Sequence, residues 1–568
     1  MFTLFSKFYI LMWFAFIFLL FCSFLLLSIY FIITQGTFLL TCNILHLHPI
    51  SLSFSLLLDS WSSLFSSVVC MITAVVFMFT SVYFSSFNKI SYFIWITSLF
   101  VLSMLFLINF SDMFFVMLGW DGLGVVSFFL ILYYQSPVSS FSALLTVIMN
   151  RLGDSILILV ICIYFTMSHS TIFLYSSHSS ILLSFLLLAG LSTKRALFPF
   201  SPWLPAAIAA PTPISSLVHS STLVTAGLYL VLRNYDYLSC YSSLLSLLTM
   251  LGLFTSLYAG LSALVESDLK KVVALSTLSH LGFISFSMGL GWVNLAMFHL
   301  LSHALFKSSL FISLGSFISF NYHYQDSRYF SSLSSSSSLF TSIILISEAN
   351  LFALPFLRGF YSKDYILEAL PYSYFGGPVL SCVVYFNVIL TYCYSLRTFL
   401  SLVSSLKINR FYQPNPSSPV FSLSLFLLSL TSLFFGLVYT SLLYPPHFSV
   451  PFILKCAPSI TLILTLLLFC GYFSSNFGLP SLSFLNLSGT TIIYLSHFWG
   501  SFTSRYYLSA SSILWHTLEQ GVIHHIITRF PYSFITYPST LMAHLLFSPL
   551  KLPSITLILT LLLFLLTL

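Results

Sequence analysis

Apolar runs of about twenty residues follow one another along almost the whole chain. A helix needs about twenty apolar residues to cross the hydrocarbon core of a bilayer, so each run is a candidate membrane span. Only 5% of the residues are charged, against about 25% in soluble domains. The sequence therefore predicts an all-α polytopic membrane protein with spans near residues 8–33, 61–84, 91–110, 112–134, 140–166, 181–200, 213–233, 241–265, 270–290, 292–318, 339–357, 376–400, 419–442, 452–474 and 552–568.

The basic residues of the loops test this count of about fifteen spans. With that count, one membrane side receives Lys7, Lys89, Lys270, Lys271, Arg328, Lys407, Arg410, Arg505, Arg529 and Lys551. Only Arg233 lies clearly in a loop on the other side. Because cytoplasmic and matrix loops carry the excess of Lys and Arg, the N-terminus is predicted to face the cytoplasm or matrix. The basic residues are scattered and form no patch, which excludes nucleic acid as a partner.

Three regions depart from simple spans. Residues 37–57 alternate enough to predict a short hairpin on the outer side. Two apolar spans are interrupted, one beside Lys194 and one beside Lys363, by the residues Pro199, Pro202 and Pro205, and by Pro355 and Gly359. Broken membrane helices persist only where they are buried or line a cavity, and duplicated transporter halves show such pairs.

The third region, residues 485–540, is too polar to span. It contains LWHTLEQGVIHHIITRF, with charges and histidines on one face and Leu514, Leu518, Val522 and Ile526 on another. This pattern favours an amphipathic helix along the membrane surface, followed by one last span. The alternative is a loosely folded loop before that span.

The stretch MFHLLSHALFK carries His299, His303 and Lys307 inside a predicted span. Steps of four residues keep the three side chains on one helix face, fanned over roughly 80°. Ionisable groups at membrane depth are costly and by default face a bundle interior or a water-filled path. Two imidazoles and an amine can pass protons, whereas the alternative is a set of buried polar groups that only hold helices together.

Further ionisable residues occur in other apolar spans. The candidate set for a proton path is Asp121, Lys194, His219, His299, His303, Lys307, Lys363 and Asp364, with Asp154, close to Arg151, as a supporting residue. A lysine amine removed from water loses part of its preference for the charged form, and a nearby carboxylate restores it. Moving such a carboxylate can load and unload a proton. The set therefore predicts a continuous polar axis.

Several other kinds of site are excluded. The nine cysteines form no CxxC motif and no metal-ligand spacing with histidine, so no metal or iron–sulfur site is expected. Nothing resembles a GxGxxG or Walker loop, so no nucleotide site is expected in this chain.

Between about residues 50 and 400, several stretches resemble the antiporter-like membrane-subunit family of respiratory complex I, the proton-pumping NADH:ubiquinone oxidoreductase. They include LGWDGLGVVSFFLI, NRLGDSILI, STKRALFPFSPWLPAAIAAPTPISSLVHSSTLVTAGLYLVLR, ESDLKKVVALSTLSHLGF, AMFHLLSHALFKSSLFISLGS and LPFLRGFYSKDYILEAL. The strings PTPxSxLxHSSTxVxAG and GFYSKD are specific to this family. The surface helix followed by a last span favours subunit 5 over its shorter sister subunits.

The resemblance implies a role for each matching residue. Asp121 takes the place of the family's glutamate, the partner of Lys194; its shorter side chain leaves direct contact open, and a bridging water could restore it. His219, His299, His303 and Lys307 match a hydrated central axis, and Lys363 and Asp364 match the exit toward the outer side. Two departures are Ala209, where many relatives carry an acid, and an N-terminus one span short of sixteen.

The resemblance also implies an architecture of two inverted five-helix repeats. The expected parts are N-terminal spans (1–90), a first half-channel repeat (91–235), a second half-channel repeat (236–402), additional spans (403–480), the lateral surface helix (481–550) and a terminal anchor (551–568). No cofactor is expected in this chain, whereas NADH, FMN, iron–sulfur clusters and ubiquinone would be bound by partner subunits. The expected setting is the mitochondrial inner membrane, with the N-terminus and surface helix on the matrix side and sister antiporter-like subunits as partners.

Two other functions fit some of these motifs. One is a subunit of a multisubunit cation/proton antiporter or a membrane-bound hydrogenase, against which the surface helix and terminal span argue. The other is a structural brace with a decayed channel, against which Lys194, Lys307 and Lys363 argue. A stand-alone channel fits least, because no ring or filter is visible.

Overall fold

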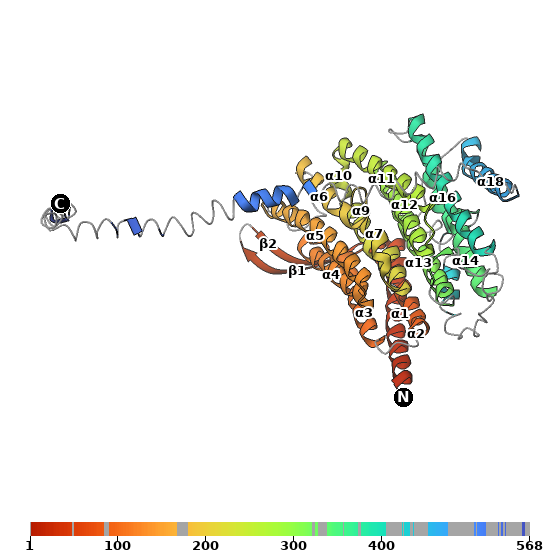
Figure 1. Cartoon of the computed structure of the whole chain (residues 1–568), viewed down its shortest axis with the longest axis horizontal. Coiled ribbons are helices and arrows are strands. Elements are labelled where there is room, and N and C mark those ends of the chain that lie inside the picture. The colour runs from red at the N-terminus through yellow and green to blue at the C-terminus, as the bar shows by residue number, and fades with distance from the viewer. Residues whose placement is uncertain are drawn as a thin grey trace. The chain divides into compact units, whose positions relative to one another are not determined.

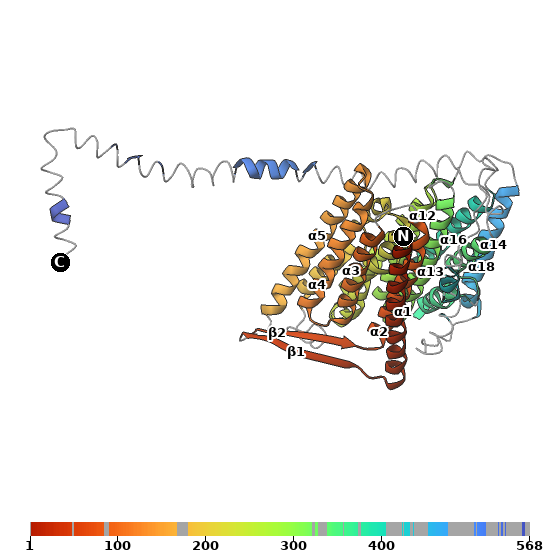
Figure 2. The same ribbon diagram turned by 90° about the horizontal axis from the view of Figure 1, so that it is seen from below.

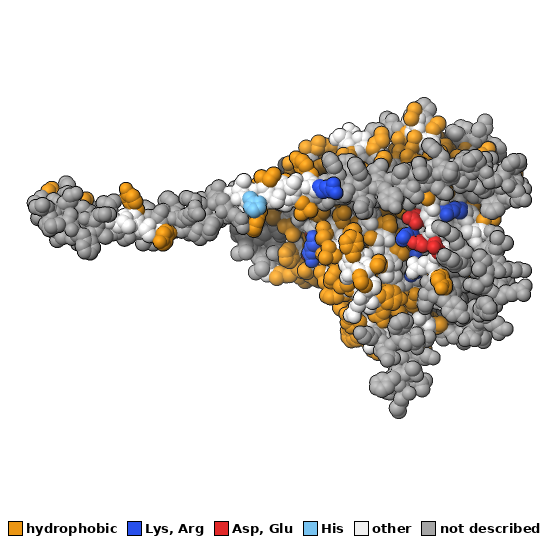
Figure 3. Space-filling view, in the orientation of Figure 1, with side chains coloured by type: hydrophobic (Ala, Val, Ile, Leu, Met, Phe, Trp, Pro, Cys, Tyr) orange, Lys and Arg blue, Asp and Glu red, His pale blue; other side chains and the backbone are white. Residues whose placement is uncertain are grey.

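The computed structural model describes residues 2–47, 50–84, 90–166, 180–320, 324–327, 338–355, 357–372, 377–404, 423, 425–431, 436, 452–474, 505–506, 508–517, 532, 536–537, 540 and 559–562. Within this described part, ten helices are long and apolar enough to cross a membrane. They pack side by side (Figure 1), which confirms an all-α polytopic membrane protein. Figure 3 shows the consequence on one face, where apolar side chains dominate and charged ones occupy a few spots.

The N-terminal part contains the predicted hairpin. Helix α1 (Phe2–Thr34) leads into β1 (Phe38–Leu47), which pairs antiparallel with β2 (Ile50–Leu58) before α2 (Ser60–Tyr83) begins. The register shifts between Asn43 and Leu45, which is a β-bulge. The hairpin lies across one end of the helices (Figure 2), and β2 meets the bundle there through a backbone hydrogen bond of 3.1 Å from Ser111 to Ser55. We call this the hairpin end.

The remaining helices follow the predicted spans closely. They are α3 (Ile90–Asn109), α4 (Met113–Ile131), α5 (Pro137–Thr166), α6 (Ile181–Lys194), α7 (Trp203–Ala206), α8 (Thr212–Ile214), the π-helix η3 (Ser215–Thr222), α9 (Leu223–Arg233), α10 (Tyr235–Ser239), α11 (Ser242–Ala263), α12 (Leu269–Gly289), α13 (Val293–Phe320), α14 (Ser338–Leu351), the π-helix η6 (Phe360–Asp364), α15 (Tyr365–Ala369), α16 (Pro378–Ser404) and α18 (Phe452–Ser474). Two predictions were too long: the span at 181–200 ends at Lys194, and the span at 339–357 ends at Leu351. Both helices stop where the chain breaks.

Contacts between loops fix the alternation of the helices. At the hairpin end, Arg233 after α9 forms an ion pair with Asp59 before α2. At the opposite end, Asp268 before α12 forms a β-bridge with Asp326 after α13. Arg397 of α16 donates to the Leu264 carbonyl at that same end. Arg233 therefore lies on the side opposite to Lys270 and Lys271, as the positive-inside reading predicted.

The two broken helices end in the same way, which reveals the internal repeat. Ala196 and Ala353 both adopt a left-handed backbone, with φ of 53° and 54°. The amide of Ala196 bonds to the Thr193 carbonyl and that of Ala353 to the Asn350 carbonyl, both at 3.2 Å. The break after α6 belongs to the five spans that begin with α3, and the break after α14 to the five that begin with α11. Because four spans lie between α3 and α11, these two helices run in opposite directions, and so do the two sets that they begin.

Three spans are buried over almost their whole length: Thr212–Arg233, Leu269–Gly289 and Val293–Ser319. They occupy the middle of the bundle, and other helices separate them from lipid. The side chains on α13 opposite the ionisable face, such as Phe298, Leu301 and Leu305, are also buried. The ionisable residues of these spans therefore lie in the core of the protein.

The chain divides into two compact units, Met1–Ile492 and Ile493–Leu568. In the second unit the described residues 508–517 are helical, with exposed side chains that include Leu514 and Trp515. Apart from a few single residues and pairs, the rest of the predicted surface helix and most of the terminal span lie outside the described residues. Residues 559–562 of that span are helical.

Candidate functional site

Lys194 is the last residue of α6 and is completely buried. Its ammonium group donates a hydrogen bond to the main-chain carbonyl of Trp120 in α4. The same nitrogen lies 3.9 Å from the centroid of the Trp120 ring, a cation–π arrangement. The direct hydrogen bond of Lys194 therefore goes to the residue that precedes Asp121, and the aromatic face adds a second favourable contact.

Two carboxylates lie near Lys194, and the supporting residue Asp154 is the more closely integrated. The Asp154 side chain is buried, accepts a hydrogen bond of 2.7 Å from the Trp120 indole and lies 3.3 Å from Arg151. Asp121 is 43% exposed and lies 3.9 Å from Arg151. Both carboxylates act on the charge of Lys194, and among the described residues neither forms an ion pair with it. Asp154 and Lys194 are instead both bonded to Trp120, Asp154 to its indole and Lys194 to its main-chain carbonyl.

This geometry predicts different effects of two isosteric substitutions. Asp154→Asn removes a buried charge that is bonded to the same tryptophan as Lys194, whereas Asp121 is 43% exposed and its charge is screened by solvent. We therefore expect Asp154→Asn to reduce proton translocation at least about twofold more than Asp121→Asn does. The measurement is proton uptake per NADH oxidised in vesicles that contain the assembled complex. Asp121→Glu serves as a control that keeps the charge. An Asp121→Asn variant that loses more uptake than Asp154→Asn would contradict this ranking.

His219 is buried inside the span Thr212–Arg233, two turns after its start. It belongs to η3, a π-helical turn, and its ring centroid lies 6.4 Å from that of Trp203. Such π-turns are rare and frequently occur at functional sites. A second π-helical turn, η6, carries the buried Lys363. Both breaks are thus followed by a π-helix that carries a predicted site residue.

The three histidines of α12 and α13 lie together. His280 Nδ1 is 3.3 Å from His299 Nε2, and the ring centroids of His280 and His303 are 5.6 Å apart. His280 therefore lies between the two histidines of α13. On the other side, His299 Nδ1 is 3.0 Å from the Ser362 hydroxyl, next to Lys363. Imidazole can accept a proton at one nitrogen while it donates from the other, so this line can relay protons.

Lysines flank the histidines. Lys307 donates a hydrogen bond of 2.6 Å to Ser276 of α12, and Lys363 donates one of 2.7 Å to Thr391 of α16. The Lys363 nitrogen also lies 4.6 Å from the centroid of the Tyr392 ring. The neighbouring Asp364 is the carboxylate that interacts with Lys363. Hydroxyl groups thus hold both amines in place while leaving them available for proton exchange.

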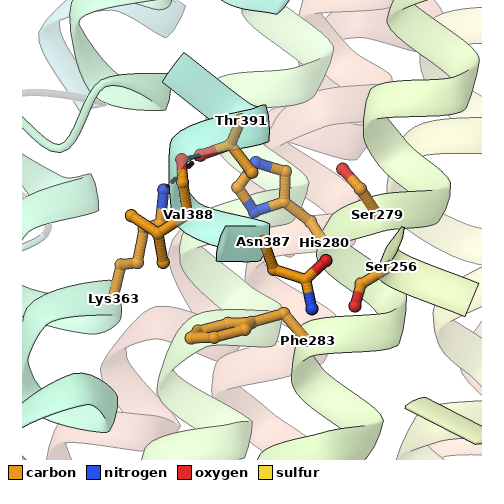
Figure 4. Close-up of a pocket in the computed structure, with 8 residues that line it drawn as sticks. All are labelled: Ser256, Ser279, His280, Phe283, Lys363, Asn387, Val388 and Thr391. Atoms are coloured by element: carbon orange, nitrogen blue, oxygen red, sulfur yellow. Dashed lines mark hydrogen bonds between the residues drawn. The ribbon is translucent and has the colours of Figure 1, made fainter. Parts of the chain in front are cut away.

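A small cavity joins His280 to Lys363 (Figure 4). Its lining residues are Ser256, Ser279, His280, Phe283, Lys363, Asn387, Val388 and Thr391. About 10 Å³ is open to the centre of a water molecule, roughly the space that one water needs. Asn387 and Nε2 of His280 are buried there and have no hydrogen-bond partner among the described residues. One water would therefore find polar partners on several sides.

The structure brings His280, His299, His303, Lys307 and Lys363 into one region, with Asp364 beside Lys363. Lys194, Asp154 and Asp121 form a separate group, and Ala209 ends the short 3₁₀ turn η2 (Ala207–Ala209) after the first break. The sequence reading missed three buried charged residues: Arg195, Glu348 and Arg358. The signal was present for Glu348 and Arg358, each a single charge in an apolar stretch, whereas Arg195 directly follows Lys194.

Comparisons with known proteins show the family to which this fold belongs. A family model described as NADH:quinone oxidoreductase/Mrp antiporter, transmembrane, matches residues 110–391. The NADH-ubiquinone oxidoreductase chain 5 of Lumbricus terrestris is 38% identical over 379 residues, which are 66% of each chain. The chain of the same name from Aedes aegypti is 36% identical over 473 residues, 81% of each chain.

This chain belongs to the NADH-ubiquinone oxidoreductase chain 5 family. It is an antiporter-like membrane subunit of a multisubunit complex, as the resemblance implied.

Two solved membrane complexes contain a chain whose fold is similar to that of this chain 5 subunit. A chain of the Mrp complex from Dietzia sp. superposes with a TM-score of 0.66 at 22% identity, over 86% of this chain and 59% of that one. A chain of the membrane-bound sulfane sulfur reductase, an archaeal respiratory membrane complex, gives a TM-score of 0.63 at 21% identity, over 72% of this chain and 84% of that one. These proteins share the antiporter-like fold.

Proposed function

We propose that this chain 5 subunit translocates protons through its buried polar residues, coupled to NADH oxidation and ubiquinone reduction in other subunits of complex I. The proposed path uses Lys194 with Asp154 and Asp121, then His219, and then the line of Lys307, His303, His280, His299 and Lys363, with Asp364 at the exit. NADH, FMN, the iron–sulfur clusters and ubiquinone would bind to partner subunits. The sister antiporter-like subunits are the proposed neighbours.

The observation that carries this proposal is the line of polar contacts around α13. The line begins at Ser362, the residue before Lys363 in the chain, and reaches His299 at 3.0 Å and then His280 at 3.3 Å. The step from His280 to His303 exceeds a direct hydrogen bond and would need a bridging water. A proton can move along such a line because each group both accepts and donates. A structural brace would not need so many titratable groups in three fully buried helices.

A test of the first half of the path replaces Lys194 by methionine. Methionine is of similar length and carries no proton, so proton uptake per NADH oxidised should fall in vesicles containing the assembled complex. We expect at least about a tenfold loss through this chain, the usual range for removing a proton-transfer group. Lys271→Met is the matched control, because Lys271 is 45% exposed and forms a surface ion pair with Asp268. Equal uptake by Lys194→Met and Lys271→Met would refute the role of Lys194.

We also propose that the protein lies in the mitochondrial inner membrane with the hairpin end outside and the opposite end facing the matrix. A membrane-impermeant maleimide should then reach Cys240, an exposed cysteine after α10, from outside only. It should label Lys271→Cys in inverted vesicles only. If the surface helix also lies on the matrix side, Ser511→Cys should likewise be labelled in inverted vesicles only. Cys240→Ser identifies the outer signal. Labelling of Lys271→Cys from outside would reverse the proposed orientation.

A further inference from the structure

Glu348 is a buried carboxylate that the proposed path does not use. It lies in the stretch ISEANL near the end of α14, just before the second break, and its residue is only 2% exposed. Helix α14 packs against α13, which carries Lys307, and against α16. An ionised carboxylate in such a place is costly unless it is paired or exchanges a proton.

The hydrogen bonding of Glu348 is incomplete. Thr398 of α16 donates to Oε1 at 3.2 Å. The other oxygen, Oε2, is buried and has no hydrogen-bond partner among the described residues. An ionised carboxylate can accept about four hydrogen bonds, whereas the protonated form carries one O–H donor. The surroundings thus fix one oxygen of Glu348 and leave the other free to take up a proton.

The nearest element with an opposite charge is α13, which packs against α14 and carries Lys307. Lys307 and Glu348 act on each other electrostatically, although among the described residues no ion pair joins them. Lys363 has its own acidic neighbour in Asp364. The second repeat therefore contains two lysine–carboxylate pairs, just as the first repeat has Lys194 with Asp154.

Glu348 also lies near the cavity of Figure 4. Tyr394 of α16 lies within the electrostatic influence of Glu348, and its hydroxyl is 3.1 Å from that of Ser279. Ser279 lines the cavity together with His280 and Lys363. The groups around Glu348 are thus Lys307 from α13 and Tyr394 and Thr398 from α16. Of these, Tyr394 links this region to the cavity, through its contact with Ser279.

We propose that Glu348 exchanges a proton with Lys307 during transport, which rests on the proposed function of the lysine. No hydrogen bond joins the two side chains among the described residues, so the proton passes from the Lys307 ammonium group through a bridging water to the Glu348 carboxylate. The products are a neutral amine and a neutral carboxylic acid, so the total charge of the two groups does not change. Glu348 then releases this proton to a group on one side and the Lys307 amine takes up another proton from the other side, which restores both charges and moves one proton.

The experiment compares Glu348→Gln with Glu348→Asp in vesicles that contain the assembled complex. Gln keeps the shape and the bond from Thr398 but cannot take up a proton, so proton uptake per NADH oxidised should fall by roughly half or more. Asp keeps the carboxyl group and should recover most of the uptake. A bracing residue would instead tolerate Gln at least as well as the shorter Asp. Glu266→Gln, the same change in the loop between α11 and α12, is the control.

Lys307→Met, measured in parallel, separates the two proposals. Normal uptake by Lys307→Met would refute the proposed function of the lysine. Loss of uptake by Lys307→Met together with wild-type uptake by Glu348→Gln would overturn only the role of Glu348. Native gels report assembly of each variant. If Glu348→Gln does not assemble, Thr398→Val decides, because loss of its hydrogen bond should lower uptake if Glu348 carries protons and leave it unchanged if not.

Discussion

Replacing Lys307 by alanine should stop proton translocation through this chain while the assembled complex remains detectable. Lys307 is completely buried and is the amine at one end of the histidine line, held by Ser276 at 2.6 Å. Alanine removes the amine that can hold a proton at this position and puts no donor or acceptor in its place. We expect at least about a tenfold loss of proton uptake. Uptake is measured in vesicles during NADH oxidation, with and without an uncoupler.

Two controls accompany this variant. Lys307→Met fills the space that alanine leaves, so it separates the loss of the amine from the formation of a cavity. Lys271→Ala removes an exposed lysine from the neighbouring helix α12. Wild-type uptake in Lys307→Met would mean that the amine is not needed, and the path would have to bypass it.

The largest effect on stability should come from the ion pair between Arg233 and Asp59. Both side chains are largely buried, and Arg233 Nη2 lies 2.6 Å from Asp59 Oδ1. Arg233 also donates to the Tyr229 hydroxyl at 2.8 Å, and Asp59 caps α2 through the Ser62 amide at 2.7 Å. Arg233→Leu leaves the buried carboxylate without its cation, which should cost about 3–5 kcal/mol in the free energy of unfolding. Thermal denaturation of the solubilised protein and abundance on native gels are the measurements.

The matched control is the exposed pair of Asp268 and Lys271, where Asp268→Asn should cost less than about 1 kcal/mol. The stability that the pair of Arg233 and Asp59 contributes should also depend on pH. Burial by itself raises the pKa of Asp59, but the hydrogen bonds and charge of Arg233 outweigh it, so the pKa is lowered. A carboxylate with a lowered pKa stabilises the folded state above its unfolded pKa of about 3.9, and this contribution is lost as pH falls through the folded value. An Arg233→Leu variant as stable as wild type would contradict the importance of the pair.

Local patterns predicted most of the helices and the places where they fail. Apolar length gave the spans, because each must cross the same thickness of bilayer. Alternation gave the hairpin of β1 and β2, and prolines marked the breaks after α6 and α14. The predicted ends at residues 200 and 357 were wrong because hydropathy continues through the breaks. The left-handed turns at Ala196 and Ala353 stop the helices earlier, and they depend on backbone conformation.

The candidate residues were also visible in the sequence, because a charge or histidine in an apolar span is conspicuous wherever it lies. Glu348 satisfied the same criterion and was overlooked. The two helix breaks show why the position of a residue in the repeat does not by itself predict a site residue. Lys194 precedes the left-handed Ala196 by two residues, whereas the corresponding position before Ala353 is Leu351. In the second repeat the lysine lies after the break, at Lys363.

The sequence alone thus determined the membrane class, the spans, their alternation and the set of titratable residues, since these depend on hydropathy and on loop charges. Only the tertiary structure decided which of those residues meet. The crossing of α4, α5 and α6 brings Asp154 and the Trp120 carbonyl, and not Asp121 alone, to Lys194. The packing of α12 against α13 inserts His280 between His299 and His303, and α14 brings Glu348 to Lys307. Contacts between helices depend on their rotation and crossing, which no spacing within one helix can specify.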